Sequence, residues 1–482
     1  MTSPFIVSKD PKKGLTREIR NSLTFGVIVG NRPFFPDALA KKGHDDIIEV
    51  VESLGHQVII LSEEETPFGT VKTHDDAKKC ADLFRFNAHK IDGIIVTLPN
   101  FGDEKSIANT IRWADLQVPI LIHAESDDPN LMRIGERRDS YCGKISVCSN
   151  LRQYNIPFSL TNSHTCPVNS DAFKNDVKTF SAICRVVNGL KQARIGAIGA
   201  RPAAFNTVRY SEKLLETAGI SVETIDLSEI FGQVKALKTD DRVKQRMDII
   251  KSYVQIGDAA PSGSLEKLAK LAIVVEQWIE ENELDAIAFQ CWTAIEEYLG
   301  IAPCAMLSIL SNNLIPAACE VDVTGALTML ALELASGSNA ALLDWNNNYG
   351  DDPNKAVAFH CSNLPADMLE NPTMDAHFSE SFKKDTAYGA IFGRISPGPF
   401  TFARISTDDL VGEIMFYTGE GEFTNDELET FGGFGVIEIP NLQDLIKQIC
   451  VSGFEHHFAA TRGDVAYIVA EALENYLNFL KK

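Results

Sequence analysis

The chain of 482 residues lacks the features of a secreted or membrane protein. No apolar run approaches the ~20 residues that a membrane helix needs, and the first 20 residues are polar, without the apolar segment of a secretory signal. Its ten cysteines include no C-x-x-C pair, which argues against a zinc site or a disulfide framework. We therefore expect a soluble cytoplasmic protein with no membrane partner.

Basic charge is scarce as well. The chain has 45 Lys and Arg residues against 66 Asp and Glu, and its formal net charge is -21 at pH 7. Nucleic-acid binding requires a basic surface, so we expect no nucleic-acid partner. The sequence contains no G-x-S-x-G elbow and no Walker-type G-K-[ST] element. The turn 196–199 lacks the third glycine of a dinucleotide fingerprint, and an NAD-linked oxidoreductase would rest on this turn alone.

The pattern of apolar runs changes along the chain. In the first two thirds, apolar runs alternate with amphipathic stretches, which predicts parallel sheets covered by helices on both faces. The last 140 residues or so carry short strand-like runs between Gly, Pro and Asp turns, which predicts a mostly antiparallel β domain. We predict an α/β fold with two doubly wound domains, residues 1–165 and 166–338, followed by a smaller β-rich C-terminal domain, residues 339–482.

Individual elements follow from the same pattern. The predicted strands are 23–29, 57–61, 92–98, 118–123, 194–198, 221–225, 286–289, 356–360, 400–405, 413–418 and 435–439. The predicted helices are 45–54, 73–88, 105–114, 173–190, 211–218, 240–254, 265–281, 322–334 and a closing helix 464–479. Residues 141–166, rich in Asn, Ser and Pro, are interpreted as a connecting region.

Three clusters of acids or imidazoles carry the chemistry. Glu296-Glu297 follows the strand 286–289, Glu320 and Asp322 follow the apolar run 314–319, and His456-His457 precedes the closing helix. Two carboxylates and one imidazole form a ligand set for a hard divalent cation such as Mn²⁺. The plainer alternatives are acids that favour a first helical turn, a helix cap at Asp322, and a structural histidine pair. His360 is expected to line the pocket at most.

Four short motifs follow one another along the chain: Gly30-Asn31-Arg32-Pro33, Gln290-x-Trp292-Thr293, Cys319-Glu320-Val321-Asp322 with Gly325, and Gly453-x-x-His456-His457. In this order they resemble the L-fucose/L-arabinose isomerase family, and its L-fucose isomerase branch in particular. The resemblance implies a Mn²⁺-dependent, or other divalent-metal-dependent, aldose–ketose isomerase that works through a cis-enediol.

The resemblance also assigns residues. It implies that Glu296 is a metal ligand and proton carrier, that Asp322 is the second ligand and catalytic carboxylate, and that His457 is the metal-binding imidazole. Glu320 is similar to an acid of the arabinose branch. The choices between Glu296 and Glu297 and between Glu320 and Asp322 stay open at this point.

The remaining assignments concern the sugar. Gln290, Trp292, Glu320 and His456 are expected to contact it. Arg32 and Phe101 are expected to reach it as well, from a neighbouring subunit of a hexameric or trimer-based homo-oligomer. Phe101 stands where the family has an aromatic residue of another kind, so L-fucose is not assumed. L-arabinose and a 6-substituted hexose such as a sulfo-sugar are alternatives, and so is a non-catalytic sugar-binding protein.

Overall fold

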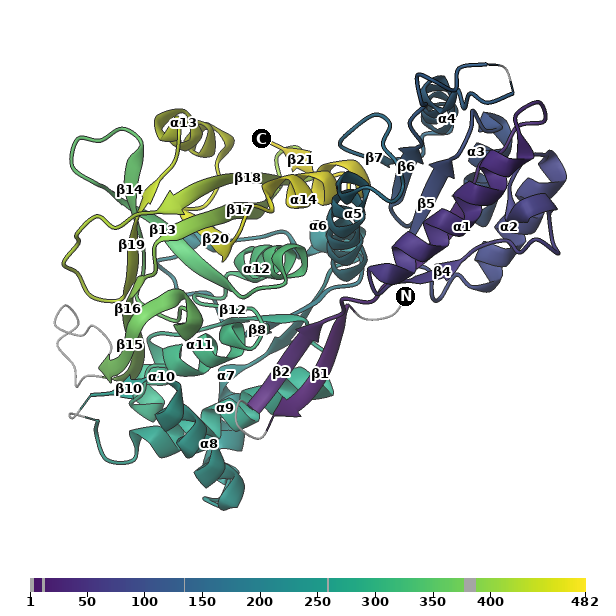
Figure 1. Ribbon diagram of the computed structural model, residues 1–482. Helices are drawn as coiled ribbons and strands as arrows, with labels where there is room; N and C mark the ends of the chain where they lie inside the picture. Colours follow the sequence, from purple (N-terminus) through teal and green to yellow (C-terminus); the bar gives the residue numbers. More distant parts are fainter. Residues whose placement is uncertain (1–3, 11–13, 134, 258–259, 377–386) are drawn as a thin grey trace. The chain divides into compact units, whose positions relative to one another are not determined.

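The computed structural model describes residues 4–10, 14–133, 135–257, 260–376 and 387–482 (Figure 1). It forms two compact units. Unit 1 is built mainly from Arg20–Asn188 and Glu471–Asn478, and unit 2 from Phe5–Ile19, Gly189–Ala470 and Phe479–Lys482. The boundaries between the three predicted domains stay a prediction.

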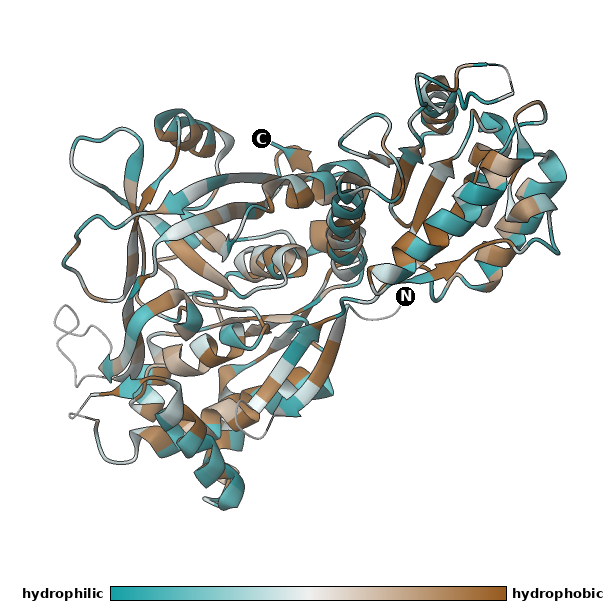
Figure 2. Cartoon of the chain, viewed as in Figure 1, coloured by the Kyte–Doolittle hydropathy of each residue, from teal (hydrophilic) through white to brown (hydrophobic). Residues whose placement is uncertain are grey.

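Unit 1 contains a five-stranded parallel sheet. Its order is β4 (Gln57–Ile59), β3 (Thr24–Val29), β5 (Gly93–Leu98), β6 (Ile120–Ala124) and β7 (Ser159–Leu160). Every residue of β3, β5 and β6 is buried, and Figure 2 shows β5 and β6 as mostly hydrophobic. Continuous apolar strands of this kind are typical of a parallel sheet that is covered on both faces.

Helices cover both faces of that sheet. On one face, α1 (Asp37–Ser53) and α5 (Asp171–Leu190) pack on the side chains of Phe25 and Val27. On the other face, Ile94 and Val96 contact a second core built with α2 (His74–Phe86), α3 (Glu104–Ala114) and α4 (Ser140–Gln153). Successive strand residues point to opposite faces, which is why one strand contributes to both cores.

Unit 2 contains a four-stranded parallel sheet in the order β12 (Ala317–Ala318), β11 (Ala286–Phe289), β8 (Arg194–Ile198) and β9 (Ser221–Ile225). The helices between β8 and the C-terminal strands are α6 (Glu212–Thr217), α7 (Leu227–Ala236), α8 (Asp241–Tyr253), α9 (Ser264–Glu281), α10 (Ala294–Leu299), α11 (Cys304–Asn312) and α12 (Val323–Ser336). An N-terminal hairpin, β1 (Phe5–Asp10) with β2 (Gly14–Ile19), also belongs to this unit.

The C-terminal part of unit 2 is a ten-stranded mixed sheet, in which most neighbouring strands are antiparallel. Its order is β10 (Gln255–Ile256), β15 (Leu369–Ala376), β16 (Tyr388–Ile395), β19 (Gly433–Glu438), β14 (Lys355–His360), β13 (Ala340–Asn348), β20 (His457–Arg462), β17 (Gly398–Asp408), β18 (Glu413–Phe423) and β21 (Leu480–Lys481). Two parallel α/β sheets and a largely antiparallel C-terminal sheet confirm the predicted fold class.

Helix α12 lies in the middle of unit 2. All its residues from Val323 to Ala335 are buried, and it contacts β8 and β11 of one sheet as well as β13, β17 and β20 of the other. A helix that is apolar all round is expected in such a core position. The side chain of Asp322 caps this helix by accepting a hydrogen bond of 2.8 Å from the backbone N–H of Gly325. The core of unit 2 therefore holds a carboxylate at its centre.

Several local predictions were wrong. The supposed connecting region contains helix α4, which buries Gly143, Val147 and Leu151 at helical spacing, together with the polar residues Ser140 and Lys144. The closing helix is short, because α14 (Ala466–Ala470) passes into a π-helical turn at Glu471–Tyr476.

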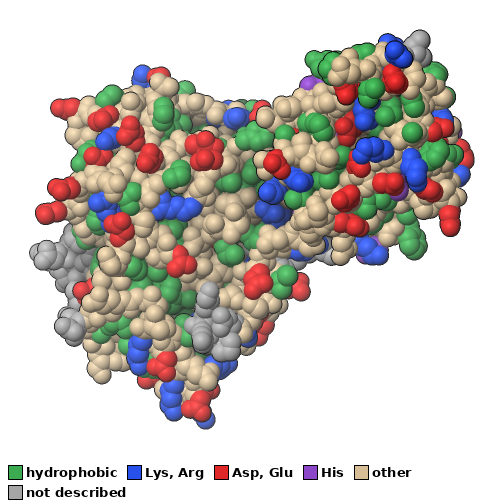
Figure 3. Space-filling model, viewed as in Figure 1, with side chains coloured by type: hydrophobic (Ala, Val, Ile, Leu, Met, Phe, Trp, Pro, Cys, Tyr) green, Lys and Arg blue, Asp and Glu red, His purple; other side chains and the backbone are tan. Residues whose placement is uncertain are grey.

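No helix in the described ranges is both long and apolar enough to span a membrane. On the face shown in Figure 3, acidic and basic side chains are interspersed.

Candidate metal and active site

The loop after β12 brings two carboxylates into the interior of unit 2. β12 pairs with β11 in parallel, so the residues that follow both strands lie at the same edge of the sheet. Glu320 and Val321 both adopt left-handed backbone conformations, with φ of 55° and 57°. Such a conformation is uncommon for residues with a β-carbon and is held by surrounding structure. The sharp turn buries Glu320 and Asp322 instead of leaving them on the surface.

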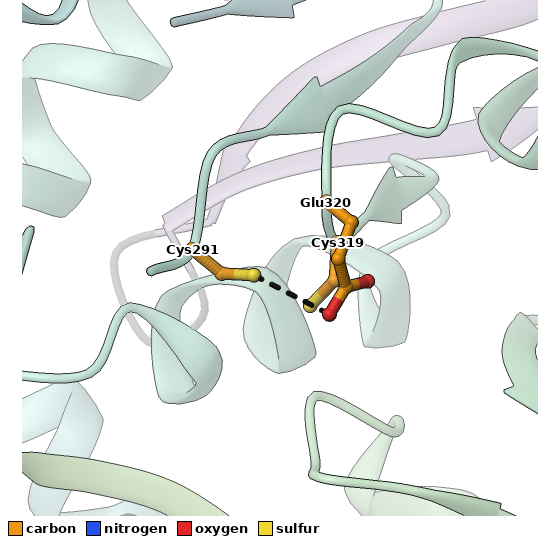
Figure 4. A group of neighbouring side chains, drawn as sticks. All are labelled: Cys291, Cys319 and Glu320. Atoms are coloured by element: carbon orange, nitrogen blue, oxygen red, sulfur yellow. Dashed lines mark hydrogen bonds between the residues drawn. The ribbon is translucent and has the colours of Figure 1, made fainter. Parts of the chain in front are cut away.

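Glu320 has polar neighbours on both of its carboxylate oxygens. The indole Nε1 of Trp292 donates to Oε1 at 3.2 Å, and the Cys291 thiol lies 3.7 Å from the same oxygen (Figure 4). His360 Nε2 lies 3.6 Å from Oε2, which itself has no hydrogen-bond partner. Burial raises the pKa of Glu320, but the neighbouring His360 and the charge of His457 hold it below its usual range. Glu320 is therefore an ionised carboxylate with an oxygen to offer.

Strand register places two imidazoles beside Glu320. Asp344 of β13 lies opposite His457 of β20 on one side and opposite Phe359 of β14 on the other, next to His360. One ligand atom each from Glu320, His360 and His457 lies within 4.8 Å of the others, and all three residues are buried.

A buried ion-pair network holds His457 in place. Asp322 Oδ2 lies 2.8 Å from Nδ1 of His457, and both Asp322 oxygens accept from the Arg404 guanidinium, at 2.6 and 2.9 Å. Burial raises the pKa of Asp322, but Arg404 and His457 outweigh it and hold the pKa far below its usual range. On its other edge, Arg404 donates to Glu455 at 3.0 Å. An ionised Asp322 accepts the Nδ1 proton of His457, which leaves Nε2 with its lone pair.

Asp344 and His456 form a second group of possible ligands together with His457. Asp344 Oδ1 is 3.3 Å from His457 Nε2 and 3.7 Å from His456 Nε2, and it has no hydrogen-bond partner. His456 is 44% exposed at its side chain, whereas His457 is 1% exposed. Burial lowers the pKa of His456, and the charge of His457 lowers it further. Of the two adjacent histidines, His457 is the interior one and His456 reaches solvent.

The other predicted residues of unit 2 lie around this group. Glu296 sits in the first turn of α10 and is half-buried; among the described residues it is in no cluster of three ligand atoms. The pKa of the buried Cys304 thiol is raised by burial and then by the charges of Cys291, Glu320 and Glu296. Gln290 Oε1 accepts from the backbone N–H of Ala200 at 2.8 Å.

Arg32 and Phe101 lie in unit 1. The Arg32 guanidinium is 4.0 Å from the centre of the Phe101 ring, donates to the carbonyl of Gly102 at 2.7 Å and pairs with Glu104. Both residues are half-buried, and the guanidinium and the ring form a cation–π contact within this unit.

From the sequence, His360 was expected to line the pocket at most, and Arg404 was missed. His360 comes from a strand whose neighbours lie about 15 and 75 residues away in sequence, and Arg404 sits inside an apolar run. A histidine at the end of a predicted strand was the available signal for His360. For Arg404 the signal was a charged residue at a position where the alternation predicts burial.

Oxygen and imidazole donors converge here in a buried site that could hold a metal ion, at the loop ends of an α/β layer, where enzymes bind small polar molecules. Comparison with known protein families identifies the class further. Residues 26–191 match the N-terminal domain of fucose/sulfoquinovose isomerases, and residues 358–481 match the C-terminal domain of L-fucose isomerase. The chain belongs to the fucose/sulfoquinovose isomerase family and is an aldose–ketose isomerase, an intramolecular oxidoreductase.

Individual relatives are distant. The chain is 25% identical over 386 residues to a sulfoquinovose isomerase of Priestia aryabhattai, a match that covers 80% of this chain and 83% of the relative. It is 25% identical to a sulfoquinovose isomerase of Alkalicoccus urumqiensis, over 60% of this chain and 65% of that one. A sulfoquinovose isomerase of Clostridium sp. is 21% identical, over 61% of this chain and 66% of the relative.

Proposed function

We propose that this isomerase depends on a divalent cation, Mn²⁺ in the first place, and converts a free sugar through a cis-enediol. The observation that carries the proposal is the buried group of Glu320, His360 and His457, in which Glu320 Oε2 has no hydrogen-bond partner. A buried, ionised oxygen that accepts no hydrogen bond is costly unless a cation or a donor arrives, so this donor set fits the ion. When bound, the cation would act as a Lewis acid on the sugar oxygens and offset the charge of the enediolate.

His457 would offer Nε2, because Asp322 fixes the proton on Nδ1. Asp322 remains a candidate for the second ligand and partner acid predicted from the sequence. The occupation of both its oxygens by Arg404 favours an indirect role, in which it orients His457 and raises the basicity of that imidazole.

Proton transfer between C1 and C2 needs a base at the sugar face of the site. We keep Glu296 in this role, because it is half-buried in the first turn of the helix that follows Trp292 and its charge reaches the same thiol as that of Glu320. Gln290, Trp292 and His456 would orient the hydroxyl groups, which contributes through positioning. Arg32 and Phe101 would contact the sugar from a neighbouring chain of a homo-oligomer.

The proposed substrate is an aldohexose with an anionic substituent at C6, because three relatives are named sulfoquinovose isomerases. L-fucose and L-arabinose are the neutral alternatives. The overall acidity of the chain does not oppose an anionic sugar, since a few local arginines suffice to bind it.

The test is aldose-to-ketose conversion after removal of metal with EDTA. Sulfoquinovose, L-fucose and L-arabinose are compared with and without added Mn²⁺, in D₂O, with NMR detection of deuterium at C1 or C2. The proposal expects turnover only with metal and deuterium at the transferred position. Turnover that survives metal removal would contradict the proposal. Hydrogen transfer without any deuterium exchange from the solvent, together with full activity of Glu296→Gln, would contradict it as well.

A further inference from the structure

A cavity of about 240 Å³ lies beside the loop that carries Glu320. It is formed where β8 and β9 end, and its lining includes Gly199, Arg201, Arg209, Tyr210, Thr224 and Val321. Neither the catalytic proposal nor the metal group uses this cavity. Val321 is the residue next to Glu320, so the cavity and the metal group share one short loop.

The charge of the cavity is one-sided. Two arginines line it, and no Asp or Glu is among the described residues that do so. Arg201 donates to the carbonyl of Pro202 at 3.0 Å and Arg209 to that of Asn206 at 2.8 Å, contacts that hold the side chains without neutralising them. In the part of the chain that the structure describes, neither guanidinium has a carboxylate within 4.0 Å. Two unneutralised guanidinium groups in one cavity are unusual in a chain with 21 excess negative charges.

The segment between the two arginines reaches the metal group. The ring of Phe205 lies 5.5 Å from that of Trp292, 5.8 Å from His456 and 6.1 Å from His457, measured between ring centres. One loop therefore covers the imidazoles with its middle residue and lines the cavity with residues on either side.

Gly199 allows this arrangement. Its φ is +81°, and a β-carbon there would lie 2.5 Å from Oε1 of Gln290. The turn between β8 and Arg201 thus packs directly on a residue that the reaction is proposed to use, and only glycine fits there without strain.

We infer that the cavity binds the anionic end of the sugar, a sulfonate or phosphate on the carbon farthest from the carbonyl, through Arg201 and Arg209. The inference rests on the proposed function and names its substrate class. Guanidinium groups bind tetrahedral oxyanions with paired charge-assisted hydrogen bonds, and the hydroxyl of Tyr210 can add a donor. Burial, and then the charge of Glu212, raises the pKa of Tyr210, so this hydroxyl keeps its proton at neutral pH.

The test uses a ligand that cannot be isomerised, so it does not depend on turnover. Binding of 6-deoxy-6-sulfohexitol, hexitol 6-phosphate and the neutral hexitol to the metal-free full chain is measured by calorimetry. Arg201→Gln and Arg209→Gln are each expected to weaken binding of an anionic hexitol by about 10- to 100-fold. Affinity for the neutral hexitol should stay the same, and the lysine variants should retain part of the anion affinity.

The matched control is Arg242→Gln, an exposed arginine of α8 that lies outside this cavity and should leave all three affinities unchanged. Circular dichroism confirms that each variant is folded. Preference between the two anionic hexitols tells sulfonate from phosphate. Equal affinity of wild type and both arginine variants for the anionic hexitols would overturn the inference, and so would wild-type binding of the neutral hexitol alone.

The two proposals fail in different ways. Arginine-dependent binding of the sulfohexitol without turnover of any sugar would leave the anion site standing and remove the catalytic proposal. Metal-dependent turnover of neutral sugars, with no effect of either arginine variant on any ligand, would do the reverse.

Discussion

Replacing Asp322 by Asn separates a carboxylate that orients His457 from one that performs the chemistry. The substitution keeps the shape of the side chain and removes one charge from a fully buried network. Arg404 would lose a two-pronged ion pair, with contacts of 2.6 and 2.9 Å, and His457 would lose the acceptor that fixes its Nδ1 proton.

Two magnitudes follow. Removing one partner of a buried ion pair costs about 3–5 kcal/mol of unfolding free energy. Loss of the carboxylate behind a metal-binding imidazole lowers metal affinity by about 10- to 100-fold. If Asp322 acts only through His457, the turnover number at saturating Mn²⁺ should fall far less than the affinity. Urea unfolding and Mn²⁺ titration followed by activity provide the measurements.

Glu455→Gln is the matched control, because Glu455 pairs with the same arginine at 3.0 Å and is absent from the candidate metal groups among the described residues. It should reproduce much of the stability loss and leave Mn²⁺ affinity near that of wild type. The reasoning is refuted if Asp322→Asn abolishes turnover at saturating metal while binding the metal normally. That result would restore Asp322 as a direct catalytic group.

Three further predictions concern carboxylates and a buried histidine. Glu296→Gln should lower the turnover number by about 10²- to 10⁴-fold. Glu297→Gln, at the next residue, which is exposed, should change the turnover number little. Steady-state kinetics measure both effects, and equal effects would reject the assignment. Burial lowers the pKa of His123 to about 4, so this imidazole takes up its proton at a lower pH in the folded protein than in the unfolded chain. This histidine contributes roughly 3 kcal/mol to the unfolding free energy above pH 6.5, and that contribution is lost as pH falls towards 4. His123→Gln should flatten the pH dependence of the unfolding free energy over that window, as measured by urea unfolding. Burial raises the pKa of Glu276 to about 7 despite the charge of Arg246. The contribution of Glu276 to the unfolding free energy is therefore full below pH 4.5 and is lost as pH rises through 7. Glu276→Gln should remove this slope of unfolding free energy against pH, and an unchanged slope would contradict the assignment.

Local patterns in the sequence were enough to predict most strands of the parallel sheets, although β7 was missed. β8, β9 and β11 begin and end where predicted, because short apolar runs between polar helices leave little choice of boundary. Helix α4 was missed because its buried stripe is narrow and includes a glycine and a lysine. The N-terminal hairpin was missed because two short polar strands gain their stability from the unit on which they pack.

The site was predicted only in part, for a related reason. Glu320 and His457 were singled out from strand ends and adjacent histidines, and the structure brings their side chains together. His360 joins them through the register of β13, β14 and β20, which depends on pairing between distant segments that no local pattern encodes. The buried partner Arg404 has the same origin.

The most direct test of the account is anomalous X-ray diffraction from crystals of the full chain soaked with Mn²⁺. We expect one strong peak within coordination distance of Glu320, His360 and His457, which disappears in Glu320→Gln and His457→Asn. A peak on Glu296 and Asp322 instead, with none at Glu320, would contradict it.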